Sequence, residues 1–150
     1  MFRNEISSEV TIEATPAEVW EVLTDLPRYG EWNPGFAEIT GRIEVGARLD
    51  ATFAKDGGRG MTLHPTVTAA EPGRGFTWLG RLVLPYVFDG EHRFEIHELA
   101  PDRVRVVQGE RFRGLLVPFV RRMIERDTLA MFERVNAALA ARVEDVRAAA

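Results

Sequence analysis

The fold is decided by residues 15–34, which read TPAEVWEVLTDLPRYGEWNP. Thr15 can cap a helix whose first position is Pro16, and Glu18, three residues after the cap, completes a capping box. Residues at helical spacing then give the helix an apolar face: Val19, Trp20, Val22 and Leu23. The pattern therefore predicts a short amphipathic helix that begins at residue 16.

A second short helical turn is expected directly after the first. The first helix cannot continue through Pro27, because proline lacks a backbone N–H and clashes with the preceding turn. The turn that follows must carry Tyr29 and Trp32. The elements on either side of this helix pair then decide the architecture.

Alternating hydrophobicity predicts seven antiparallel strands, one before the helix pair and six after it. The first strand turns its even-numbered residues inward: Phe2, Ile6, Val10 and Ile12. The other six form a meander separated by Gly, Pro and Asp, at about 36–43, 47–54, 61–71, 74–84, 88–99 and 103–113.

The tight turn at residues 71–74, EPGR, sets one register. Proline and glycine at its two central positions are typical of a type II turn. A turn at this place puts Val67 opposite Trp78 and Ala69 opposite Phe76.

The turn Ala100-Pro101-Asp102 closes the next hairpin. A slip of one residue would turn every apolar side chain to solvent, so the register is well specified. It pairs Ile96 with Val106, Phe94 with Gln108, and His92 with Glu110.

From Gly114 onward the hydrophobic period changes from two to 3.6. One stripe contains Leu116, Phe119, Val120, Met123, Ile124, Met131, Val135, Leu139 and Val143. This predicts one helix over residues 115–145, roughly thirty residues and about 45 Å long. A curved sheet gripping such a helix is an α+β arrangement, and it tends to leave a cavity at the end where the short helices hold the long helix away.

Composition narrows the class of protein. The 150 residues, 45% of them hydrophobic, suit a single domain spanning residues 1–150. A net charge of -4 with no basic run argues against a nucleic-acid partner. The apolar stretches are too short for stable membrane insertion, and the N-terminus lacks a signal-peptide core, so we expect a cytoplasmic protein.

Metal and cofactor sites are not expected. The chain has no cysteine and only three histidines. Strand alternation puts His64 and His97 on the outer face, away from His92. The Asp56-to-Gly60 segment is rich in glycine but has no strand-to-helix context, so it does not predict a phosphate-binding loop.

The chain resembles the SRPBCC superfamily, also called START-like or helix-grip, and within it the bacterial polyketide cyclase/dehydrase and lipid-transport branch. The resemblance rests on Ile12-Glu13-Ala14, Pro16, Val19-Trp20, Leu23-Thr24-Asp25, Tyr29, Trp32-Asn33-Pro34, FDGEHRF at 88–94, GERFRGLL at 109–116, Phe132, Asn136 and Leu139. It implies a helix-grip fold in which a curved seven-stranded sheet wraps around the C-terminal helix. The superfamily also includes oxygenase subunits, but a chain without cysteine and with three histidines cannot hold their Rieske cluster.

His92 and Glu110 are the candidate catalytic residues, because alternation puts both on the inner face and the register makes them neighbours. They could act as a general acid–base pair without a cofactor. The interpretation we favour is a hydrogen-bonded pair that fixes the register or anchors the polar end of a ligand. Gln108 lies one step along the same strand, and Asp127 falls near the apolar stripe of the long helix.

The expected ligand-binding residues are mainly aromatic residues and methionines that project toward the interior: Phe36, Phe53, Met61, Trp78, Phe94, Phe112, Met123 and Met131. Such a lining suits a flat or flexible apolar ligand. Trp78, Phe94 and Met123 are assigned to the cavity first, because they lie in the middle of their strands and helix. Ordinary core packing is the alternative for most of the set.

Three classes of function follow. A binding protein for a small aromatic, acyl or lipid-like molecule needs only the cavity. A polyketide cyclase or dehydratase would also need His92 and Glu110 to reach the ligand. A co-chaperone-like interaction domain would present an exposed apolar patch, and no long apolar surface run indicates one.

Overall fold

The computed structural model describes residues 5–56, 58–81 and 87–150. Its strands form two antiparallel sheets. The larger sheet has the order β1 (Glu5–Ile12), β8 (Arg103–Arg113), β7 (Asp89–Ala100), β6 (Gly75–Arg81) and β5 (Thr66–Glu71). The smaller sheet contains β2 (Phe36–Thr40), β3 (Asp50–Lys55) and β4 (Gly58–Leu63).

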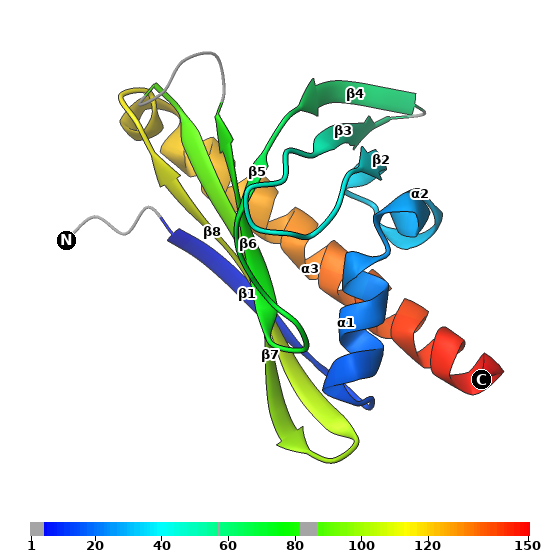
Figure 1. Ribbon diagram of the computed structural model, residues 1–150. Helices are drawn as coiled ribbons and strands as arrows, with labels where there is room; N and C mark the ends of the chain where they lie inside the picture. The colour runs from blue at the N-terminus through cyan, green and yellow to red at the C-terminus, as the bar shows by residue number, and fades with distance from the viewer. Residues whose placement is uncertain (1–4, 57, 82–86) are drawn as a thin grey trace.

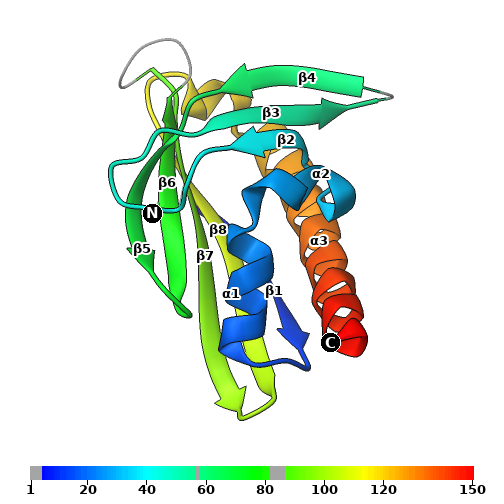
Figure 2. The same cartoon turned by 45° about the vertical axis from the view of Figure 1, so that its right-hand side comes forward.

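Two short helices and one long helix complete the fold. The short ones are α1 (Pro16–Thr24) and α2 (Tyr29–Trp32), joined by the 3-10 turn η1 (Leu26–Arg28), and the long one is α3 (Val117–Ala149). Helix α3 crosses the larger sheet, where it packs against β1 and β8 (Figure 1). Figure 2 shows the smaller sheet at the end of the molecule where α3 begins, with α1 and α2 between the sheets and the far half of α3. The predicted α+β arrangement is confirmed.

The capping box at the start of α1 forms as predicted. The backbone N–H of Glu18 donates to Thr15 Oγ1 over 3.2 Å, and that of Thr15 donates to Glu18 Oε1 over 2.9 Å. The hydroxyl of buried Tyr29 donates to the Leu23 carbonyl, which ties the second turn to the end of α1. These local bonds fix the angle between the two short helices.

The segment 61–71 is two strands and not the single strand predicted. The chain leaves β4 at Leu63 and enters β5, in the other sheet, at Thr66. Pro65 lies at the break and cannot donate to a strand ladder, which explains why the strand ends there. The structure therefore has eight described strands where the sequence predicted seven. Phe2 and residues 82–84 of the predicted strands lie outside the described residues.

The turn at 71–74 has the predicted type II conformation, but only one of the two predicted residue pairs beside it forms. Gly73 has φ +76°, as the third position of a type II turn requires, and Val67 pairs with Trp78. A bulge follows Val67, so Ala69 pairs with Thr77 and not with Phe76. The extra residue in a bulge is invisible to a prediction that counts strictly in pairs.

The hairpin between β7 and β8 has the predicted register at all three residue pairs named from the sequence. The pairs are Ile96–Val106, Phe94–Gln108 and His92–Glu110. On this face the two strands contribute Phe94, Ile96, Val104 and Val106 to the main core, which also receives the apolar face of α1.

The predicted stripe of α3 is right for its second half but only partly right for its first, where Ile124 packs inward and other members of the stripe do not. Val135 and Val143 are buried, whereas Phe119 is 85% exposed and Met123 is 55% exposed, and Leu116 precedes the helix and is also exposed. The first turn packs inward through Val117 instead. Phe119 follows Val117 by two residues, about 200° around the helix axis, and so points away. No described helix is long and apolar enough to span a membrane.

Candidate functional site

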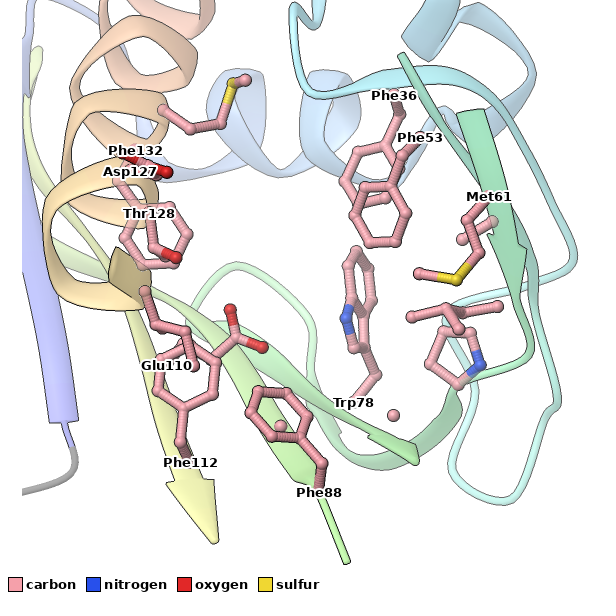
Figure 3. Close-up of a pocket in the computed structure, with 17 residues that line it drawn as sticks. Phe36, Phe53, Met61, Trp78, Phe88, Glu110, Phe112, Asp127, Thr128 and Phe132 are labelled. Carbon is pink, nitrogen blue, oxygen red and sulfur yellow. The ribbon is translucent and has the colours of Figure 1, made fainter. Parts of the chain in front are cut away.

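A cavity of about 400 Å³ lies where the two sheets and the first half of α3 meet. Its walls come from three directions, which Figure 3 shows around the central space. The smaller sheet supplies Phe36, Ala51, Phe53, Met61 and Leu63; the larger sheet and the loops next to it supply Pro65, Trp78, Gly80, Phe88, Gly90, Glu110 and Phe112; helix α3 supplies Ile124, Asp127, Thr128, Met131 and Phe132. The lining is predominantly apolar.

Aromatic rings pack against one another along the wall opposite α3. The rings of Phe36 and Phe53 stack with centroids 5.1 Å apart, and Trp78 meets Phe36 edge to face at 6.1 Å. Such packing holds flat surfaces toward the cavity in fixed orientations. The wall is therefore suited to stacking against a planar apolar ligand.

Two glycines keep the floor of the cavity open. Gly80 on β6 pairs with Gly90 on β7, and both line the cavity. The position two residues along from Gly80 is Trp78, so side chains at 80 would point inward as well. A missing side chain on each of two paired strands leaves space that an ordinary sheet would fill.

Glu110 projects from β8 into this space. Figure 3 shows its carboxylate between Trp78 and the α3 side chains Thr128 and Phe132. The carboxylate makes no hydrogen bond or ion pair with any other residue that the structure describes. Burial against this apolar lining raises the pKa of Glu110 to about 7. The carboxyl is therefore poised to gain or lose a proton near neutral pH.

His92 is the strand partner of Glu110, but its ring is engaged elsewhere. It stacks on Trp78 with centroids 4.8 Å apart, and its Nε2 lies 3.0 Å from the side-chain amide nitrogen of Gln108. Burial, assisted by the charge of Arg93, lowers the pKa of His92 to about 3, so the ring is neutral. A neutral ring can accept at Nε2 from the amide.

The predicted hydrogen bond between His92 and Glu110 is therefore wrong. Within the described residues the two side chains form neither a hydrogen bond nor an ion pair, although the register brings their backbones together. Long and planar side chains on paired residues can lean in different directions along the sheet. Gln108, one pair away, is the partner that the ring reaches.

The structure brings most of the predicted site residues to the cavity wall. Eight of them line it: Phe36, Phe53, Met61, Trp78, Glu110, Phe112, Asp127 and Met131. His92 and Gln108 lie behind Trp78 and do not line it. Phe94 packs in the core against Phe76 and His92, farther along β7. Met123 is exposed on the outside of α3, because the inward face at that height carries Ile124.

The sequence interpretation missed several lining residues. Phe88 and Gly90 have the same parity as His92 in the predicted strand, so alternation already pointed them inward. Thr128 and Phe132 follow Ile124 at helical spacing, four and eight residues on. No sequence pattern indicated that Gly80 and Gly90 lie opposite each other, because this depends on how β6 and β7 pair.

Comparison of the sequence with known protein families identifies the family of this chain. The family model described as "Polyketide cyclase / dehydrase and lipid transport" matches residues 3–144. The chain belongs to this family. Its members typically bind a hydrophobic ligand. No curated protein matches the sequence at a significant level.

Several solved structures share the fold of this chain. A START superfamily protein from Mycobacterium smegmatis is 20% identical and superposes with a TM-score of 0.70, covering 95% of this chain and 98% of the other. The Zhui aromatase/cyclase from Streptomyces sp. R1128 is 18% identical, with a TM-score of 0.70 and coverage of 95% and 94%. A norcoclaurine synthase variant from Thalictrum flavum is 14% identical, with a TM-score of 0.72 and coverage of 97% of both chains.

Among the described residues, no group of three or more metal-ligating side chains gathers in this family member. His64 pairs with Asp50 through Nδ1 over 2.6 Å, and His97 lies 4.0 Å from Glu95. Neither pair lines the cavity: His97 lies on β7, and His64 lies in the break between β4 and β5. The polar chemistry available inside the cavity is therefore that of Glu110, Asp127 and Thr128.

Proposed function

We propose that the chain binds a small hydrophobic molecule, aromatic or acyl in character, in the cavity between its two sheets and α3. The observation that carries the proposal is the cavity itself: about 400 Å³, lined mainly by aromatic and aliphatic side chains. Ligand sites of proteins are typically concave and apolar, with a few polar groups and roughly 300–1,000 Å³ of space. The family's association with lipid transport and polyketide cyclisation is consistent with such a ligand.

Blocking the cavity tests the proposal. A side chain built at Gly80 has no atom closer than 3.8 Å to its Cβ, so Gly80→Leu fills the cavity without a clash at the backbone. We expect this variant to keep its fold by circular dichroism and to lose binding of an apolar aromatic probe. Thr77→Leu, on the opposite face of the same strand, is the matched control and should bind normally.

Native mass spectrometry of the purified protein provides the second arm. A small molecule that co-purifies with the wild type and is absent from Gly80→Leu supports a role in binding. Equal retention of probe and co-purifying molecule by the two proteins would place the binding elsewhere and refute the proposal.

A second candidate function is acid–base catalysis of a cyclisation or dehydration without a cofactor. It is favoured by Glu110, whose carboxyl faces the cavity, has no partner in the described part of the chain and has a pKa of about 7. A group that titrates near the working pH can both accept and return a proton. His92, buried behind Trp78, would then hold Gln108 and Trp78 in place and not touch the substrate.

The catalytic candidate predicts a specific pattern in two variants. Glu110→Gln should abolish turnover of a polyketide-like substrate while leaving its affinity within a small factor. His92→Gln, which can still hydrogen-bond Gln108, should retain most of the turnover. Retained turnover in Glu110→Gln would end the catalytic candidate and leave the binding function standing.

A further inference from the structure

We propose that the cavity selects ligands whose polar group donates hydrogen bonds, as a protonated amine or a hydroxyl does, and rejects carboxylates such as free fatty acids. The selecting group is Glu110. This inference rests on the proposed binding function and deepens it by naming the class of polar group on the ligand.

The charges around the cavity have one sign. Its lining contains two carboxylates, Glu110 and Asp127, and includes no Lys, Arg or His among the described residues. Asp127 lies at the edge, where its side chain is 61% exposed and accepts from Nε of Arg126 over 2.9 Å. Glu110 therefore remains as the inner carboxylate, and no cation of the described residues neutralises it.

An unpartnered carboxylate in an apolar space is costly, and a ligand can remove that cost. A donor placed at Glu110 restores the hydrogen bond that burial took from water. A donor that carries a positive charge gains further from the charge-assisted bond. It also gains from the aromatic rings of Trp78 and Phe53 in the lining, because aromatic rings attract cations.

An anionic ligand meets the opposite situation. Its carboxylate would enter a space of low dielectric where the inner fixed charge has the same sign. The described part of the lining offers it no arginine or lysine to pair with. A second carboxylate at Glu110 is tolerated only if the two share a proton. The lining thus separates ligands of one size by their polar group.

Gly90 sets the position of the selecting carboxylate. A Cβ at residue 90 would lie 2.5 Å from Glu110 Oε1, so the carboxylate rests directly over the glycine on the neighbouring strand. The backbone of Gly90 does not have a positive φ. Gly90→Ala therefore moves the carboxylate without straining the strand and without removing its charge.

The test uses three probes with one ring system: naphthalene carrying an aminomethyl, a hydroxymethyl or a carboxylate group. Isothermal titration calorimetry at pH 7.5 measures their affinities for the full chain. We expect the amine and the alcohol to bind, and the carboxylate to bind at least about tenfold more weakly than the amine, a difference of about 1.4 kcal/mol.

Three variants then locate the selectivity. Glu110→Gln should weaken the amine, strengthen the carboxylate and reduce the ratio between them to about threefold or less. Gly90→Ala should also reduce the ratio, because the carboxylate is displaced. Glu91→Gln removes a carboxylate from the opposite face of the sheet and should leave the ratio unchanged.

The outcomes separate this inference from the proposed function. Equal binding of all three probes to the wild type would overturn the inference while supporting a hydrophobic binding site. A ratio that survives in Glu110→Gln would also overturn it, because another group would then be the selector. Binding of none of the probes would count against the proposed function, and the inference would fall with it.

Discussion

The burial of Glu110 predicts how the stability of the protein changes with pH. Because the pKa of this carboxyl rises from 4.5 to about 7 on folding, the folded state holds a proton that the unfolded state has lost between these pH values. The unfolding free energy must therefore fall as the pH rises through this window. At 1.36 kcal/mol per pKa unit the full loss is about 3 kcal/mol. Glu110 is only half-buried, so solvent screening reduces the loss to about 1–3 kcal/mol.

Glu110→Gln isolates this effect. Glutamine resembles the protonated carboxyl in shape and charge, so the variant should match the wild type near pH 4.5 and exceed it by about 1–3 kcal/mol at pH 7.5. Urea unfolding followed by tryptophan fluorescence at pH 4.5, 5.5, 6.5 and 7.5 gives the difference directly. Other titrating groups are common to both proteins and cancel.

The stability of the wild type must be compared with that of Glu110→Gln because His92 also changes its pKa on folding. Its pKa falls from 6.5 to about 3 on folding, so the unfolded state takes up a proton first as the pH is lowered, and the stability that neutral His92 contributes is lost below pH 6.5. Between pH 4.5 and 6.5 this trend opposes that of Glu110. The wild type alone can therefore look nearly independent of pH while both groups are strongly perturbed.

A stability difference between Glu110→Gln and the wild type that does not change with pH would refute this reasoning. If Glu110→Gln and the wild type differ by the same amount at all four pH values, within about 0.5 kcal/mol, then water solvates the carboxylate fully in the folded protein. Glu91→Gln, from the opposite face of the sheet, reports what the loss of a surface carboxylate does and serves as the background.

Four further predictions concern stability, each measured by urea unfolding at pH 7. His92→Ala leaves the buried Gln108 amide without its partner and removes a stacked ring, so the free energy of unfolding should fall by about 1–3 kcal/mol or more. A smaller loss would mean that water hydrogen-bonds the amide in the variant. Thr15→Ala removes the N-cap of α1 and should cost about 1 kcal/mol, with no loss expected in Thr15→Ser. Phe132→Ala should cost about 3–5 kcal/mol, because that ring is buried. Phe119→Ala should change stability by less than about 0.5 kcal/mol, and a large loss there would contradict its exposed position on α3.

The elements that the sequence predicted well are those set by local chemistry. The capping box of α1 needs only two side chains three residues apart, and it forms as expected. The turn at 100–102 and the alternation on both of its strands specify the pairing of His92 with Glu110, because a slip would expose the whole apolar face. Most of the cavity-lining residues on β6 and β8 follow from the same alternation.

The orientation of side chains within those elements was harder to predict. The predicted stripe of α3 includes Phe119 and Met123, yet both side chains are exposed. Hydrophobic periodicity shows that a helix has an apolar face, but it cannot show where along its length the sheet stops covering that face. The ring of His92 likewise lies next to the Gln108 amide and not the Glu110 carboxylate, because Trp78 stacks on the ring and fixes its orientation.

The amino-acid sequence by itself determined the order of elements, the helix start at Thr15 and the hairpin register near the site, because each depends on residues close together in the chain. The tertiary structure alone decided that β4 and β5 join different sheets, that Gly80 faces Gly90 and that the Glu110 carboxylate has no partner among the described residues. These three features depend on segments that meet only when the sheets close on α3. The cavity is the space left by that closure, and its chemistry is set by which side chain happens to face it without a partner.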